Sequence, residues 1–159
     1  MPVLVTGMPT ESEPPTEQWR FETDGKIRSS PTVYDDTVYV GSNDGGLYAV
    51  DRRTGEQHWT LQTNGPIRGS PTVFGRTVYV GSGDGSIYAV DTETGTCRWQ
   101  YETDGSITGS PVIYNLTLFA ASNSGQVSAI DLQRRDPVWT VDLNGSILAS
   151  PLVVDNTDR

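Results

Sequence analysis

The chain has 159 residues, enough for one domain with a sizeable core, and its 17 glycines and 10 prolines favour short strands and tight turns over helices. Twenty acidic residues stand against eleven basic ones, which argues against nucleic-acid binding because neutralising phosphates requires clustered Lys and Arg. A formal net charge of -9 with Lys26 as the single lysine is typical of salt-adapted, halophilic proteins, the alternative being an ordinary acidic surface.

Residues 1–18 are predicted to be a flexible N-terminal segment outside the folded unit. Their apolar run is only a few residues long, and no basic stretch precedes it. Signal peptides and membrane spans need longer apolar runs, so we expect neither here. The sequence leaves the cellular location open.

From Trp19 onward the chain repeats with a period of forty residues. The repeat is marked by Trp19, Trp59, Trp99 and Trp139, and by Ser-Pro pairs that begin at residues 30, 70, 110 and 150. More than half of the positions are identical when residues 23–62 are aligned with residues 63–102. A strand-rich repeat of this length is the signature of a propeller blade, since helical repeats of similar length need two amphipathic helices.

Each unit is predicted to contain four short strands. In the second unit they are expected at residues 70–74, 77–82, 86–91 and 96–102. Gly75-Arg76 suits a two-residue hairpin, and other turns between the strands also contain Gly or Asp. The predicted fold is therefore an all-β propeller of four-stranded blades, with complete blades at residues 30–62, 70–102 and 110–142.

The two ends of the repeat region, 19–159, predict only part of a further blade. Residues 19–23 would supply its outer strand, and residues 150–154 would start the next unit. Propellers usually close by pairing their terminal strands within one blade, which protects the sheet edges. Three hypotheses remain open: a piece of a larger ring, copies that associate to complete a ring, or a compact four-bladed ring with a defective blade.

Two units share the pattern A-x-D-x-x-T-G-x-x-x-W. It is filled by Ala49, Asp51, Thr54, Gly55 and Trp59, and again by Ala89, Asp91, Thr94, Gly95 and Trp99. The third unit keeps Ala129, Asp131 and Trp139 but has Arg134-Arg135 in place of Thr-Gly, which predicts a less regular turn. Over residues 19–154 the pattern resembles the tryptophan-docking motif of the pyrroloquinoline quinone (PQQ) repeat family, which includes quinoprotein dehydrogenases and BamB-type assembly lipoproteins.

A structural role is predicted for the residues of this pattern and for Trp19. A Trp side chain buries a large area and carries an N–H that needs a partner, while Ala and Gly leave room for a neighbour and Asp with Thr can hydrogen-bond a turn. The resemblance implies that each Trp stacks between adjacent blades. It also implies a noncatalytic, BamB-like scaffold for a protein or peptide partner, and family members are often exported or found at the cell surface.

The resemblance also raises the question of PQQ-dependent catalysis, against which the residues argue. Quinoprotein dehydrogenases share a vicinal cysteine pair, calcium ligands and a catalytic Asp, whereas Cys97 is the only cysteine of this chain. We therefore expect no enzyme activity, no catalytic residue, no bound cofactor and no metal site. The alternative is a piece of a longer quinoprotein whose catalytic residues lie outside this chain.

The remaining candidates for chemistry are predicted to have structural roles. His58, the sole histidine, falls at a variable repeat position and is expected on an exposed strand face. Asp44 and Asp84 lack the spacing of a calcium loop and are predicted turn residues. Arg28 and Arg68 could line the mouth of a channel, but the later units carry no charge at their position.

Overall fold

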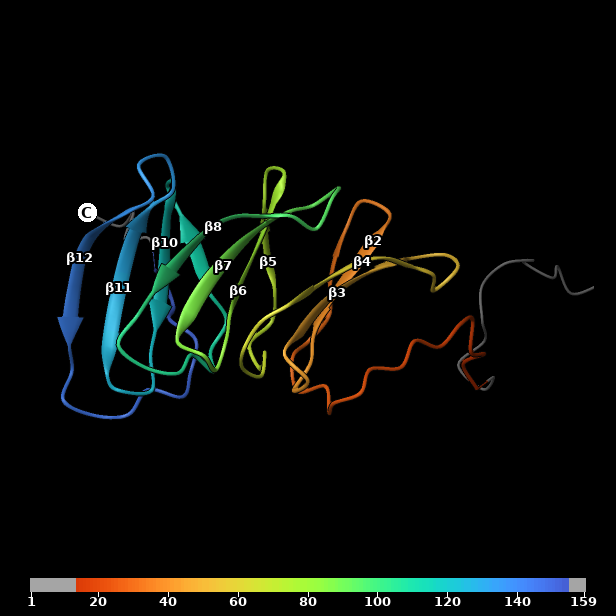
Figure 1. Ribbon diagram of the computed structural model, residues 1–159, viewed down its shortest axis with the longest axis horizontal. Coiled ribbons are helices and arrows are strands. Elements are labelled where there is room, and N and C mark those ends of the chain that lie inside the picture. Colours follow the sequence, from red (N-terminus) through yellow and green to blue (C-terminus); the bar gives the residue numbers. More distant parts are fainter. Residues whose placement is uncertain (1–13, 155–159) are drawn as a thin grey trace, which may run out of the picture.

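The computed structural model describes residues 14–154 and consists of three four-stranded antiparallel sheets (Figure 1). Each sheet corresponds to one 40-residue unit, so the predicted all-β fold of four-stranded blades is confirmed. Most of the predicted flexible segment, residues 1–18, lies outside the described residues. No helix of the described part is long and apolar enough to cross a membrane.

The strands follow one another in sequence order within each blade. Blade 1 contains β1 (Thr32–Tyr34), β2 (Thr37–Gly41), β3 (Gly46–Asp51) and β4 (Gln57–Gln62). Blade 2 contains β5 (Thr72–Phe74), β6 (Thr77–Gly81), β7 (Ser86–Asp91) and β8 (Cys97–Glu102). Blade 3 contains β9 (Val112–Tyr114), β10 (Thr117–Ala121), β11 (Gln126–Asp131) and β12 (Asp136–Asp142).

The hydrophobic core lies in the two seams between blades. Side chains alternate between the two faces of a strand, so Tyr79 points into the seam with blade 3 while Val78 and Val80 point into the seam with blade 1. The first seam buries Tyr39, Leu47, Ala49, Trp59, Ile67, Val78, Val80, Tyr88 and Val90. The second seam buries Tyr79, Ile87, Ala89, Ile107, Leu118, Ala120 and Ile130. A single blade therefore buries its faces only by packing on its neighbours.

The inner strands of successive blades are joined by a serine ladder with a spacing of forty residues. The backbone N–H of Ser30 donates to Ser70 Oγ at 2.9 Å, and that of Ser70 donates to Ser110 Oγ at 2.7 Å. The N–H of Ser110 donates in turn to Ser150 Oγ at 2.8 Å. The ladder fixes the register in which each blade follows the one before it.

The strands predicted at residues 19–23 and 150–154 do not form. Neither segment is a strand in the structure, since no strand within residues 14–154 pairs with it. The three blades lie in a row and the ring is not closed (Figure 1). The compact four-bladed ring is therefore not the structure of this chain.

Candidate functional site

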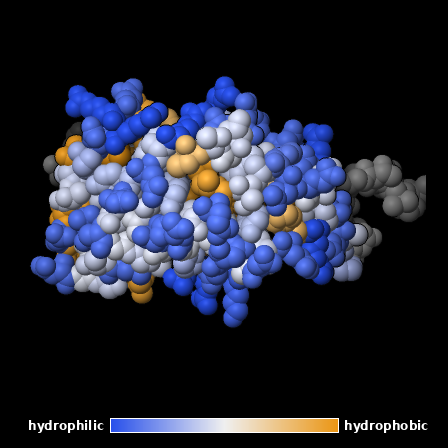
Figure 2. Space-filling model, in the orientation of Figure 1, coloured by the Kyte–Doolittle hydropathy of each residue, from blue (hydrophilic) through white to orange (hydrophobic). Residues whose placement is uncertain are grey.

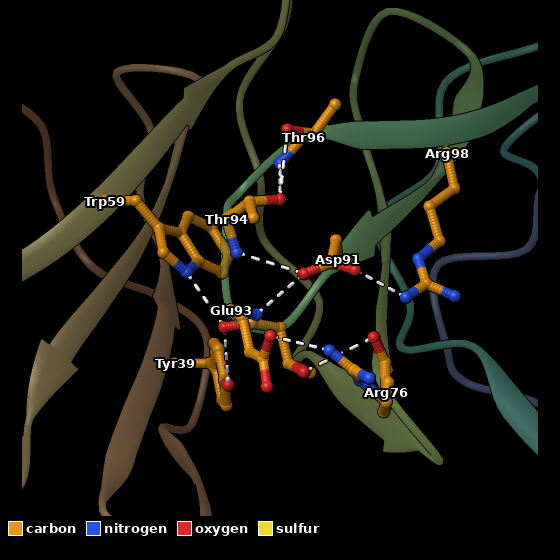
Figure 3. Close-up of polar contacts among 9 residues, drawn as sticks. Tyr39, Trp59, Arg76, Asp91, Glu93, Thr94, Thr96 and Arg98 are labelled. Carbon is orange, nitrogen blue, oxygen red and sulfur yellow. Dashed lines mark hydrogen bonds and ion pairs between the residues drawn. The ribbon is translucent and has the colours of Figure 1, made fainter.

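The seam between blades 1 and 2 shows how the tryptophan motif works (Figure 3). Trp59 is 8% exposed, and its indole Nε1 donates to the carbonyl oxygen of Thr92 at 3.0 Å. Its ring lies 5.8 Å from that of Tyr39, centroid to centroid. A Cβ atom on Gly95 would lie 2.6 Å from the Trp59 ring, so only glycine fits there. The Trp of one blade thus docks on the Asp-x-x-Thr-Gly turn of the next blade.

The docking turn is held in shape by its own side chains (Figure 3). Asp91 Oδ1 accepts hydrogen bonds from the backbone N–H groups of Glu93 and Thr94, at 2.8 and 3.0 Å. Thr94 Oγ1 accepts one from the N–H of Thr96 at 3.3 Å. Gly95 adopts a φ of +71°, a conformation that glycine reaches without steric cost. The turn is therefore preformed as a docking site for an indole ring, and we call this site the seat.

Blade 1 presents the same seat to Trp19, although Trp19 has no complete blade of its own. Its Nε1 donates to the carbonyl oxygen of Arg52 at 2.8 Å. A Cβ atom on Gly55, which has a φ of +75°, would lie 2.8 Å from the Trp19 ring. Asp51 Oδ1 accepts the backbone N–H groups of Arg53 and Thr54, both at 2.8 Å.

The turn of blade 3 keeps the same form without Thr and Gly. Asp131 Oδ1 accepts the N–H groups of Gln133 and Arg134 at 2.8 and 2.9 Å, and Arg135 takes the place of glycine with a φ of 62°. Trp99 and Leu132, which belongs to this turn, both pack against the core of the second seam, and Trp99 is only partly buried. The turn of blade 3 is thus only slightly less regular than the other two. The free-energy cost of lacking glycine lies in the positive φ of Arg135.

Replacing Arg135 with Gly is expected to raise the free energy of unfolding by about 1 kcal/mol. Relief of the positive φ stabilises the folded chain by about 1–2 kcal/mol, and the greater conformational entropy of glycine in the unfolded chain offsets part of this gain. Arg134, which has no positive φ, is the matched control. Arg134→Gly should destabilise by about 0.5–1 kcal/mol through the entropy of the unfolded chain. Urea unfolding of both variants checks the sign, and equal effects would contradict the strain argument.

Acid should weaken the seams through the turn aspartates. The hydrogen bond from Arg98, and those from the N–H groups of Thr94 and Glu93, hold the pKa of Asp91 well below its usual range. Backbone N–H groups likewise lower the pKa of Asp51 and of Asp131. A carboxyl with a lowered folded-state pKa stabilises the fold above its unfolded value of about 3.9, and this contribution is lost as the pH falls further.

Urea midpoints are therefore expected to fall steadily as the pH is lowered from about 5 to about 2. Asp91→Asn cannot be protonated in this range and keeps an oxygen acceptor, so its midpoint should fall less than that of the unsubstituted chain. Glu102, an exposed residue at the end of β8 and outside the docking turns, provides the control variant Glu102→Gln. A fall in midpoint as steep in Asp91→Asn as in Glu102→Gln would contradict the assignment.

A row of exposed aromatic side chains lies on the rim that carries the docking turns. The inner-strand hairpins share this rim because Arg52, Thr92 and Leu132 donate their N–H groups to hairpin carbonyls. The row, which we call the aromatic rim, consists of Tyr34, Phe74 and Tyr114, with exposed fractions of 44%, 44% and 38%. Sequence reasoning missed it, although an aromatic residue at the same place in all three units was the available signal.

A cleft of about 300 Å³ opens on the aromatic rim between blades 1 and 2. It is lined by Tyr34, Asp35, Thr37, Tyr39, Gly75, Arg76, Thr92 and Glu93. The guanidinium of Arg76 pairs with the carboxylate of Glu93 at 2.6 Å, which leaves the charge of Asp35 uncompensated within this lining (Figure 3 shows the Arg76–Glu93 pair). The cleft thus brings charged and hydroxyl side chains together with the exposed ring of Tyr34.

A family model described as outer membrane protein assembly factor BamB matches residues 12–134. The chain belongs to this BamB-like PQQ-repeat family. Its fold is similar to the crystal structure of BamB from Moraxella catarrhalis, with 26% sequence identity and a TM-score of 0.74, over 87% of this chain and 44% of that one. No curated protein matches the chain.

Two further structures share the BamB-like fold at lower identity. The computationally designed Ika8 protein is 15% identical with a TM-score of 0.72, over 82% of this chain and 41% of that one. Quinohemoprotein alcohol dehydrogenase from Comamonas testosteroni is 23% identical with a TM-score of 0.65, over 74% of this chain and 21% of that one. At these identities the likeness concerns the fold alone. The chain spans less than half the length of each of these structures.

The other predicted residues of this BamB-like chain lie in structural surroundings. Asp44 accepts hydrogen bonds from the N–H of Gly46 and the hydroxyl of Tyr48, as expected of a turn residue. Burial, followed by the bond to Asp44, raises the pKa of Tyr48 to about 12. His58 Nε2 lies 3.7 Å from Asp51 Oδ2 on an exposed strand face.

The remaining residues considered from the sequence lie at the surface. Cys97 is exposed at the start of β8, where its Sγ contacts the carbonyl oxygen of Trp99 at 3.3 Å. Arg28 and Arg68 are exposed at equivalent places before the inner strands. Among residues 14–154, no group of three or more His, Cys, Asp or Glu side chains is placed to hold a metal ion.

Proposed function

We propose that the chain is a noncatalytic, BamB-like scaffold that binds protein or peptide segments along the aromatic rim. The observation that carries the proposal is the repetition of an exposed aromatic residue at Tyr34, Phe74 and Tyr114 on a rigid frame. Membership of a family described as an outer membrane protein assembly factor supports a binding role. Loops that are held by a rigid β-sheet scaffold commonly form the binding sites of proteins.

The chemistry of the rim favours a partner with aromatic or aliphatic side chains and positive charge. Tyr and Phe bring large contact areas at a small cost in side-chain entropy, which makes them frequent anchors of interfaces. The formal net charge of -9 attracts basic segments over long distances at low salt. Asp35, in the cleft beside Tyr34, offers a carboxylate to a basic side chain.

Panning of displayed random peptides tests this proposal. Binders enriched on the unsubstituted chain should bind at least about tenfold more weakly to the Tyr34→Ala, Phe74→Ala, Tyr114→Ala variant, because loss of interface anchors costs more than about 1.4 kcal/mol. Arg28→Ala, Arg68→Ala is the control, since both residues are exposed away from the rim hairpins. Binders that tolerate the rim variant but not the control would contradict the assignment of the binding face.

The second candidate is a piece of a PQQ-dependent quinoprotein, favoured by the fold likeness to quinohemoprotein alcohol dehydrogenase. Titration of the chain with PQQ and calcium, followed by absorbance, distinguishes the two functions. The scaffold hypothesis expects no saturable change in the PQQ spectrum. A saturable, stoichiometric signal would instead favour the quinoprotein and contradict the noncatalytic proposal.

A further inference from the structure

The cleft between blades 1 and 2 has an excess of negative charge. Its lining contains two carboxylates, Asp35 and Glu93, and one guanidinium, Arg76. Glu93 pairs with Arg76 at 2.6 Å, so the excess charge lies on Asp35, which is exposed and follows Tyr34 in the chain. A carboxylate in a cleft that also contains an exposed aromatic ring suits a basic side chain, because the ring attracts a cation as well.

The neighbouring carboxylate, Asp36, already has partners. Its Oδ1 lies 3.0 Å from Nη2 of Arg52 and 3.6 Å from Nη2 of Arg53, so blade 1 itself neutralises this charge. Among residues 14–154 no basic side chain forms an ion pair with Asp35. The hairpin of blade 1 therefore presents one paired carboxylate and one that is free to bind a cation.

The charge does not continue along the rim to the next pair of blades. The positions of the three charged cleft residues are occupied, forty residues later, by Gly75, Leu116 and Gln133, which carry no charge. The adjacent docking turn of blade 3 adds two guanidinium groups, those of Arg134 and Arg135. A basic side chain is therefore favoured at the first cleft and disfavoured one blade further along.

Leu116 is unusual both in its exposure and in its backbone. It is 43% exposed, whereas most of the molecular surface in Figure 2 is hydrophilic. Asn115 and Leu116 form the two-residue turn between β9 and β10, with φ values of 46° and 59°. Such turns favour glycine at the second position, and a bulky residue there costs free energy. Neither burial nor turn geometry accounts for the leucine, which points to a function of its side chain.

The exposure of the blade 3 hairpin does not depend on whether a further blade follows. Tyr114 is 38% exposed, which is less than the 44% of the corresponding aromatic residues of blades 1 and 2, although each of those blades is followed by another. The side chains of Asp36 and Arg76, at the position of Leu116, are 64% and 66% exposed. This place in the repeat is therefore open to solvent in all three blades.

We propose that the aromatic rim binds an extended peptide segment at two subsites of different chemistry. The cleft at Asp35 takes a Lys or Arg side chain, and the hairpin of blade 3, with Tyr114 and Leu116, takes an aliphatic or aromatic one. This specificity rests on the proposed scaffold function and defines which segments the scaffold selects. It also fixes the orientation of the segment along the rim, because the opposite orientation places a cation near Arg134 and an apolar side chain in a charged cleft.

Peptides enriched by panning on the unsubstituted chain, synthesised and titrated by fluorescence anisotropy, test the acidic subsite. Asp35→Asn should weaken their binding at least about fivefold, as should replacing the basic residue of the peptide with Gln. Both changes together should weaken binding no more than either alone, because they remove the same contact. Asp36→Asn removes an equal charge from the next residue and should change the affinity less than about twofold at about 0.15 M salt. Equal effects of Asp35→Asn and Asp36→Asn, or enrichment of acidic peptides, would overturn the proposal.

Leu116→Gly tests the apolar subsite with two measurements. Loss of the side chain should weaken binding of the same peptides at least about fivefold, while relief of the positive φ should raise the urea midpoint of unfolding. Asn115→Gly, at the other turn residue with a positive φ, is the matched control and should leave the affinity within about twofold. Unchanged affinity in Leu116→Gly would overturn the apolar subsite. A lower urea midpoint would contradict the argument that the leucine is kept for binding at a cost in stability.

The triple rim variant, Tyr34→Ala, Phe74→Ala, Tyr114→Ala, separates the two subsites from the scaffold function itself. Peptides that lose affinity for this variant but not for Asp35→Asn or Leu116→Gly would leave the scaffold function in place and overturn the two subsites. Peptides that bind all of these variants as tightly as the unsubstituted chain would contradict both proposals. Far-UV circular dichroism confirms folding of each variant.

Discussion

Replacing Trp59 with Ala is expected to lower the free energy of unfolding by about 3–5 kcal/mol, the range for loss of a buried aromatic side chain. Trp59 is 8% exposed, packs against Tyr39 and donates to the carbonyl of Thr92. The variant would lose the packing of the ring and leave the Thr92 carbonyl without its indole partner. A loss of this size is a large part of the total stability of a small domain, which is about 5–15 kcal/mol.

Trp139 is the matched control, because it occupies the same repeat position and no blade within the described residues covers it. It is 44% exposed, and its main contact is the ring of Phe119. Trp139→Ala should therefore cost about 1 kcal/mol or less. Urea unfolding followed by far-UV circular dichroism, at a concentration where the chain is monomeric, compares the two variants. Equal losses in the free energy of unfolding would contradict the argument that burial of Trp59 between blades 1 and 2 stabilises the chain.

Replacing Gly95 with Ala is expected to destabilise the chain by about 3 kcal/mol, because two costs combine. The residue has a φ of +71°, which costs a non-glycine residue about 1–2 kcal/mol. The added Cβ would also lie 2.6 Å from the ring of Trp59, so the indole must move out of its seat. Displacement of the ring weakens its bond to the Thr92 carbonyl as well.

Gly75 isolates the conformational part of this cost. It has a φ of +61°, but a Cβ built there meets no atom within 4 Å. Gly75→Ala should therefore lose only about 1 kcal/mol, the strain of the backbone alone. The same urea experiment measures both variants, with the fluorescence of the indole rings as a second signal. If Gly75→Ala lowers the free energy of unfolding as much as Gly95→Ala does, the contact of the added Cβ with the Trp59 ring contributes nothing to the loss.

The fold of each unit could be predicted from the sequence because it depends on local patterns. Runs of β-branched and aromatic residues, interrupted by short turns such as Gly75-Arg76, specify a four-stranded meander without reference to distant residues. The family motif likewise predicted a structural role for Asp91 and Gly95. The prediction of strands at residues 19–23 and 150–154 was wrong. A strand needs a neighbouring strand for its backbone hydrogen bonds as well as a suitable sequence.

The sequence alone determined the forty-residue period and the four strands of each blade, since these follow from the alternation of side chains and from turn chemistry. Only the tertiary structure decided which residues meet. Trp59 docks on the Gly95 turn of the following blade and not on the turn of its own unit, because that turn lies across the seam. Equal motifs can therefore differ in burial: blade 2 covers Trp59, whereas no blade in the part of the chain that the structure describes covers Trp139.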